Sequence, residues 1–185
     1  MQRAMIVFCL FLSLGRNAAS ADSENQSAWQ QILHDRLPAY GHRNWIVIAD
    51  SAYPAQARDG IETIVSRADH FQVLEAVLSA LSSAKHVRPI VFTDRELSYI
   101  PETDAHGITA YRSQLHTVLK NWNVQTLPHE QLISKLDATA QTFRVLIIKT
   151  NMTLPYTSVF LQLDCAYWTS EAEQKLRASM AKDER

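Results

Sequence analysis

Glycine is scarce in this chain, at four of 185 residues. No G-x-G-x-x-G, no G-x-x-x-x-G-K-[ST] and no G-x-S-x-G segment occurs, so the common fingerprints of dinucleotide-binding proteins, P-loop proteins and α/β-hydrolases are absent. A glycine-rich loop that cradles a phosphate group is therefore not expected. The composition, with 46% hydrophobic and 20% charged residues, is ordinary for a soluble globular protein.

An excess of charge of one sign is missing as well. The 18 basic and 19 acidic residues leave a formal net charge of -1, which argues against a strongly basic surface for nucleic acid. The seven histidines form no H-x-H, H-x-x-x-H or H-E-x-x-H pair, the spacings typical of metal sites. We expect no metal and no cofactor, and keep a metalloenzyme as a hypothesis that elemental analysis tests.

Long apolar runs are restricted to the N-terminus. Arg3 leads into an apolar run that is too short to span a bilayer, and Ala19-Ser20-Ala21 fits a small-x-small cleavage pattern. We predict a secretory signal peptide over residues 1–21, and hence a secreted or periplasmic protein without stable membrane association after cleavage. If the leader is not a true signal, the expected location is cytoplasmic.

Cysteine is nearly absent. The predicted cleavage removes Cys9 and leaves Cys165, and one thiol cannot form an intramolecular disulfide. Cys165 follows an apolar run, so we expect it to be a small buried hydrophobe.

The rest of the chain alternates between strand and helix patterns. After a polar leader at 22–30, a single domain is expected over 31–185. Apolar, β-branched runs predict strands at 45–49, 88–94, 143–150 and 158–164, with a weaker one at 60–65. Helical spacing of apolar residues predicts helices within 31–42, 69–84, 104–122 and 128–141, and a Ser170…Glu173 capping box opens a last helix. This order predicts an α/β layered fold with a largely parallel central sheet flanked by helices.

Ionisable and hydrogen-bonding side chains stand at the ends of these elements. His42 precedes the first strand and Asp50 follows it, His129 lies beside a helix start, and Tyr156 lies just before the last strand. Ligands of such sheets bind at loops off the strand ends. Each residue also has a plain structural explanation, as a turn cap, an exposed helix-start neighbour or a half-buried core residue.

Taken together, three segments resemble the D-ribose pyranase and L-fucose mutarotase family. "GHRNWIVIADSAYP" is similar to the family's Gly-His-x-(Asp/Asn), strand and Asp-Ala motif. "PHEQLISKL" resembles its His-Glu-x-Phe-Lys segment, with Leu132 where Phe is usual, and "RVLIIKTNMTLPYTSVFLQL" resembles its segment that ends in Pro-Tyr-x-Asn and a strand. The segments occur in the family's order and span about 33–164.

The resemblance implies sugar mutarotation, the interconversion of anomers or of pyranose and furanose forms of a free reducing monosaccharide. It implies that His42 is the proton donor and that Tyr156 acts through its phenol. It also implies that Asp50 binds sugar hydroxyls or orients the His42 imidazole, and that His129, Tyr156 and Ser158 contact the sugar. Histidine suits proton transfer because its unperturbed pKa lies near neutrality. The family also implies a homo-oligomeric ring, pentameric or decameric. The fold it implies is the α/β layered fold already predicted.

Some features depart from the family. Ser158 stands where Asn is usual, and Tyr53 adds an aromatic ring near the expected site that would stack on a sugar face. A non-catalytic monosaccharide-binding protein on the same scaffold is therefore kept as the alternative.

The opening motif also sets a geometric condition. Gly41 is expected to let the chain turn tightly into the first strand. Eight strand residues span roughly 26 Å, too far for His42 and Asp50 to share one sugar if the run is straight. Either the loop at His42 folds back, or different subunits complete the site.

Overall fold

A six-stranded sheet forms the centre of the protein, in a computed structural model that describes residues 28–183. The strands are β1 (Trp45–Ala49), β2 (Ile61–Val65), β3 (Val87–Asp94), β4 (Val124–Leu127), β5 (Val145–Lys149) and β6 (Val159–Cys165). Around them lie a first helix over 28–36, 3-10 turns η1 (Leu37–Ala39) and η2 (Arg95–Tyr99), and helices α2 (His70–Ser83), α3 (Ile108–Leu119), α4 (His129–Thr139) and α5 (Ser170–Asp183). The predicted signal peptide lies outside the described residues. None of the described helices is long and apolar enough to cross a bilayer.

The strand order is β2-β5-β1-β6-β3-β4. Three of the five neighbouring pairs are parallel (β2 with β5, β5 with β1, β3 with β4), and β6 runs antiparallel to both β1 and β3. The predicted layered α/β fold is confirmed. Because β6 runs against its neighbours, its first residues lie between the last residues of β1 and β3, which brings three chain segments to one edge.

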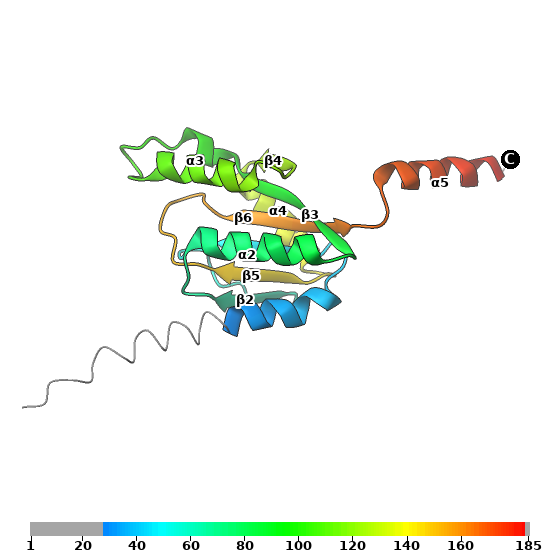
Figure 1. Cartoon of the computed structure of the whole chain (residues 1–185), viewed down its shortest axis with the longest axis horizontal. Coiled ribbons are helices and arrows are strands. Elements are labelled where there is room, and N and C mark those ends of the chain that lie inside the picture. Colours follow the sequence, from blue (N-terminus) through cyan, green and yellow to red (C-terminus); the bar gives the residue numbers. More distant parts are fainter. Residues whose placement is uncertain (1–27, 184–185) are drawn as a thin grey trace, which may run out of the picture.

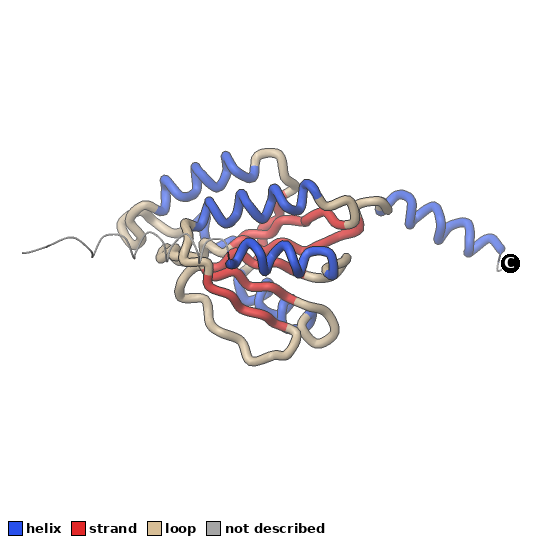
Figure 2. Tube along the Cα trace, turned by 60° about the horizontal axis from the view of Figure 1, so that its bottom comes forward, coloured by secondary structure: helices blue, strands red, loops and turns tan. Residues whose placement is uncertain are grey.

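Helices cover both faces of the sheet (Figure 2). On one face, residues of the first helix, α2 and α3 form one core cluster with alternate β1 residues, Ile46 and Ile48. On the other face α4 packs through Leu132 and Leu136 on a cluster that includes Trp45 and Val47. Successive residues of a strand point to opposite faces, so a strand covered on both sides must be apolar throughout. This explains the unbroken run of β1.

The folded domain begins earlier than the sequence pattern indicates. Residues 28–30 are helical, and Trp29 is only 1% exposed within the core that the first helix shares with α2. Residues 28–30, expected in the polar leader, therefore belong to the folded domain.

The turn before β1 also differs from expectation. Gly41 was predicted to supply the backbone freedom, yet the left-handed residue is Arg43, with φ of 77°. The turn is closed by Asn44, which donates its backbone N–H to the Gly41 carbonyl and accepts the Gly41 N–H at its side-chain oxygen at 2.8 Å.

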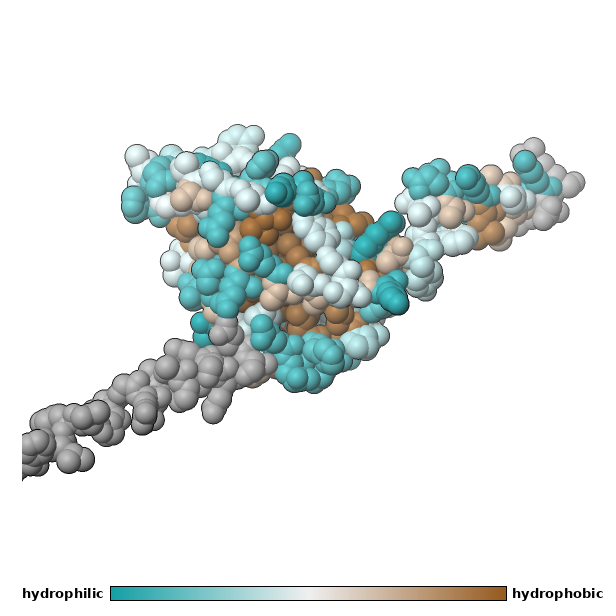
Figure 3. Space-filling model, in the orientation of Figure 1, coloured by the Kyte–Doolittle hydropathy of each residue, from teal (hydrophilic) through white to brown (hydrophobic). Residues whose placement is uncertain are grey.

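The C-terminal helix α5 projects away from the sheet, at the opposite end from the loop over 150–158 (Figure 1). Its N-terminus is capped by Thr169, whose Oγ1 accepts the Ala172 N–H at 3.2 Å, and not by the predicted Ser170. Apolar surface lies along the helix (Figure 3), and the side chains of Leu176 and Met180 are exposed there.

Candidate functional site

Three strand ends meet at one edge of the sheet and bring Asp50, Ser158 and Asp94 together. Val159, the first residue of β6, pairs with Ile48 of β1 on one side and with Thr93 of β3 on the other. Ser158 donates its hydroxyl to Asp50 Oδ2 at 3.1 Å, while Asp50 Oδ1 accepts the backbone N–H of the second residue after it at 2.9 Å. The Asp50 carboxylate is thus held in place at the edge.

The side chains of Asp94 and His129 contact each other beside this edge. His129 Nδ1 lies 3.0 Å from Asp94 Oδ1. The Asp94 side chain is completely buried, and its second oxygen, Oδ2, has no hydrogen-bond partner in the described structure. Burial raises the pKa of Asp94 to about 6, against the lowering effect of the hydrogen bond to His129. An ionised carboxylate only accepts hydrogen bonds, so His129 donates from Nδ1 and keeps Nε2 for a ligand.

Backbone hydrogen bonds and ring packing position His129 and Tyr156. The His129 N–H, at the start of α4, donates to both carboxylate oxygens of Glu96 at 3.1 and 3.0 Å. Tyr156 packs edge-on against the His129 ring, with ring centroids 5.5 Å apart, and is 40% exposed. Its φ of 55° is a left-handed conformation that costs free energy in a bulky residue, and such strain concentrates at functional sites.

A buried polar chain anchors the loop that carries Tyr156. His70 lies with Nδ1 3.2 Å from Thr150 Oγ1 and Nε2 3.2 Å from the Tyr111 hydroxyl. That hydroxyl donates to the Thr157 carbonyl at 2.7 Å. The two threonines flank the loop, so α2 and α3 hold both of its ends. Burial lowers the pKa of His70 to about 4, so this imidazole is neutral at physiological pH.

The structure brings together four of the five sequence-predicted site residues: Asp50, His129, Tyr156 and Ser158. It places His42 elsewhere. His42 lies before β1, whereas Asp50 follows β1, and His42 lines a cavity with residues of α5 at the far end of the sheet. The loop at His42 does not fold back toward Asp50 within the chain.

Two further residues change the expected site. Asp94 was missed, although the predicted strand over 88–94 ends in Asp just as the strand over 45–49 is followed by Asp50. Tyr53 is only 4% exposed and packs in the core with Trp45 and Phe92, so it is not available to stack on a sugar.

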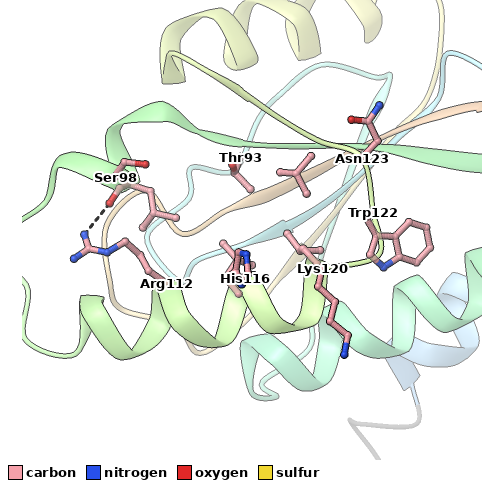
Figure 4. A pocket seen from close by; sticks show the side chains of 11 residues that line it. Thr93, Ser98, Arg112, His116, Lys120, Trp122 and Asn123 are labelled. Atoms are coloured by element: carbon pink, nitrogen blue, oxygen red, sulfur yellow. Dashed lines mark hydrogen bonds between the residues drawn. The ribbon is translucent and has the colours of Figure 1, made fainter.

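A separate groove of about 580 Å³ lies between α3 and the β3–β4 side of the sheet. Figure 4 shows Arg112 and His116 on successive turns of α3, and Lys120 directly after the helix, along this groove. Arg112 already donates to the Leu97 carbonyl at 3.1 Å and to the Ile100 carbonyl at 2.8 Å. None of the five sequence-predicted site residues lines this groove.

Within residues 28–183, no three His, Cys, Asp or Glu side chains are placed to share a metal ion.

Comparison with known proteins places the chain in a family. Residues 26–166, well over half of the chain, match the RbsD / FucU transport protein family. The chain therefore belongs to that family. No curated protein sequence gave a significant match.

Two solved structures align with about three quarters of this chain. RbsD of Bacillus subtilis, complexed with D-ribose, is 24% identical, with 75% of this chain and 92% of that chain covered and a TM-score of 0.48. The fucose mutarotase of Streptococcus pneumoniae, in complex with L-fucose, is 19% identical, with coverage of 76% and 94% and a TM-score of 0.48.

Proposed function

We propose that this protein is a monosaccharide mutarotase that interconverts the anomers or ring forms of a free reducing sugar, such as ribose or fucose, by proton transfer. The observation that carries the proposal is the His129–Asp94 pair beside Tyr156, at the edge where Ser158 holds Asp50. Family membership supports the reaction class. The pair supplies a histidine with one nitrogen anchored and the other free, which is what general acid–base chemistry needs.

Ring opening breaks the bond between the anomeric carbon and the ring oxygen. A proton leaves the anomeric hydroxyl and another is delivered to the ring oxygen, and reclosure reverses both transfers. His129 Nε2 is suited to accept the first proton because the Asp94 carboxylate anchors Nδ1 and so orients the ring. Tyr156 acts on the sugar through its phenol, and Asp50 binds sugar hydroxyls. Ser158, expected to contact the sugar, is buried, and its hydroxyl holds the Asp50 carboxylate instead. No cofactor takes part in these transfers.

His42 supplies the second proton from another copy of the chain. Within one chain, His42 precedes β1 and Asp50 follows it, so the two residues lie at opposite ends of this strand. They therefore cannot contact the same sugar molecule. A homo-oligomeric ring, pentameric or decameric, that sets the His42 end of one subunit against the Asp50 edge of the next completes the site. Most complexes of this kind are symmetric, so each subunit gives one half-site and receives one.

Exchange NMR of free sugars tests the reaction. We expect purified protein to accelerate anomer or ring exchange of at least one of ribose, fucose, galactose and glucose above the buffer rate. The alternative, a non-catalytic monosaccharide-binding protein, predicts saturable binding while exchange of all four sugars stays at the buffer rate.

We further propose that the protein acts outside the cytoplasm, after removal of residues 1–21. N-terminal sequencing of the protein recovered from its native compartment is expected to begin at residue 22, and an intact Met1 on a cytoplasmic product would overturn this.

A further inference from the structure

A cavity of about 740 Å³ lies where β6 leads into α5, next to the turn that carries His42. Its walls come from three places: the turn at His42 and Arg43, the end of β6, and the first turns of α5. Residues 167–183 lie beyond the part of the chain that matches the family. The cavity is therefore built partly from a segment that the family match does not include.

The charged groups of this cavity are paired with one another or with neighbouring residues. Glu173 accepts from Arg177 Nε at 2.7 Å, and Asp164 accepts from Arg88 Nη2 at 2.8 Å. Arg43 lies over the Phe143 ring, 5.6 Å from its centroid. Because acidic and basic side chains balance here, the cavity favours a neutral ligand that forms hydrogen bonds. The groove along α3 differs, since Arg112, His116 and Lys120 line it.

The aromatic side chain of Trp168 lines this cavity in a defined orientation. The indole Nε1 of Trp168 donates to Glu173 Oε2 at 2.8 Å, and Glu173 is itself held by Arg177, so the ring orientation is fixed. Trp168 is nevertheless 44% exposed, and its neighbour Tyr167 is 78% exposed. The face of an aromatic ring is electron-rich and attracts the weakly positive C–H groups on one side of a pyranose.

We propose that this cavity is a saccharide subsite in which a pyranose ring stacks on Trp168, with Glu173, Gln174 and Asp164 as hydrogen-bonding partners for its hydroxyls. Aromatic surface with a few convergent polar groups is the usual composition of a small-molecule site. Since His42 lines the same cavity, the subsite adjoins the proposed proton donor. The substrate class that fits both is a reducing saccharide with one further sugar unit. The link to His42 rests on the proposed mutarotase function, whereas saccharide binding itself does not.

Methyl pyranosides separate the two claims, because their locked anomeric carbon prevents ring opening. The probes are the methyl pyranosides of glucose, galactose and fucose, titrated against the full-length protein. Cys165, expected from the sequence to be buried, is only partly buried and lines the cavity. Its alkylation rate, followed by mass spectrometry of its peptide, therefore reports occupancy. We expect saturable protection of Cys165 by at least one probe.

Variants of Trp168 locate the binding. Trp168→Ala is expected to weaken probe affinity about tenfold, and Trp168→Phe, which keeps a ring, to stay within about threefold of wild type. Tyr99→Ala is the control, because Tyr99 is 78% exposed and does not line the cavity. Absence of protection by all three probes, or a Trp168→Ala variant that binds like wild type, overturns the subsite. If the probes bind as expected but the protein does not accelerate sugar exchange above the buffer rate, only the proposed mutarotase function is overturned.

Discussion

His129 Nδ1 lies 3.0 Å from Oδ1 of Asp94, a carboxylate whose side chain is completely buried. The two residues come from different elements, β3 and α4, and are 35 positions apart in the chain. A buried carboxylate without a full set of hydrogen bonds is costly to ionise, and the pKa of Asp94 is accordingly raised to about 6. The relationship makes stability and activity at this edge depend on pH.

Asp94→Asn is expected to remove one component of the pH dependence of stability. In the folded protein burial raises the pKa of Asp94 from 3.8 to about 6, so the folded state holds this proton more tightly than the unfolded state. Its contribution to the free energy of unfolding is therefore present below pH 3.8 and is lost as pH rises through about 6. Urea unfolding from pH 3.5 to 8 measures this. Relative to the variant, wild type should lose stability up to about pH 6 and then change no further. A constant difference over the whole range would contradict the account.

His70 is expected to act in the opposite direction. Burial lowers the pKa of His70 from 6.5 to about 4, so the unfolded state binds this proton more tightly. The contribution of His70 to the free energy of unfolding is fully present above pH 6.5 and is lost as pH falls through about 4. His70→Gln should remove this loss and, at pH 7.5, should destabilise by about 1–3 kcal/mol because the hydrogen bonds to Thr150 and Tyr111 are disturbed.

The same urea series, run on His70→Gln, checks that prediction. A variant that retains the wild-type decline between pH 6.5 and 4 would show that another group is responsible. His34 is a suitable control position, since its side chain is 82% exposed, and His34→Gln should leave the decline in place.

Gly60 and Gly41 are expected to respond oppositely to alanine. A Cβ at Gly60 would overlap the backbone carbonyl of Ala140, which is not a flexible side chain and cannot move aside cheaply. Gly60→Ala should therefore destabilise by about 1–3 kcal/mol. No atom lies within 4 Å of a Cβ at Gly41, and its φ is not positive, so Gly41→Ala should be neutral or stabilise by about 0.4–1 kcal/mol. Thermal unfolding of both variants gives the comparison, and equal losses would refute it.

Ser158→Ala is expected to weaken sugar binding more than the chemical step. The hydroxyl of Ser158 donates to Asp50 at 3.1 Å, and its loss frees the carboxylate to rotate. One lost hydrogen bond corresponds to a rise in KM of about fivefold, with kcat roughly unchanged. Ser134→Ala is the control, because the Ser134 hydroxyl bonds only to a backbone carbonyl on the exposed side of α4. A fall in kcat at constant KM would instead place Ser158 in the proton transfer.

Local pattern predicts the elements well where burial and periodicity agree. The run at 45–49 is apolar throughout because helices cover both faces of β1, and the sequence reveals that directly. It does not reveal β4, Val124–Leu127, because this edge strand is short and exposed. Trp29 was assigned to the leader because its neighbours in the chain are polar, whereas its burial depends on distant residues of α2.

The site was predictable only in part, for a topological reason. Motif resemblance selects Asp50, His129 and Tyr156, but the Asp94–His129 pair depends on β3 and α4 meeting in space. His42 belongs to the same motif as Asp50, yet the strand between them carries the two to opposite ends of the sheet. Sequence proximity within one motif therefore does not imply one site in one chain.

The central claim is that His42 of one subunit and His129 of another complete each site, and complementation tests it most directly. His42→Ala and His129→Ala are each expected to lose most of the sugar exchange measured by NMR while remaining folded. Co-expression of the two inactive chains in equal amounts should restore about a quarter of the wild-type exchange rate, because about one interface in four then pairs an intact His42 with an intact His129. Mixed oligomers that remain as inactive as either variant alone would contradict a shared site.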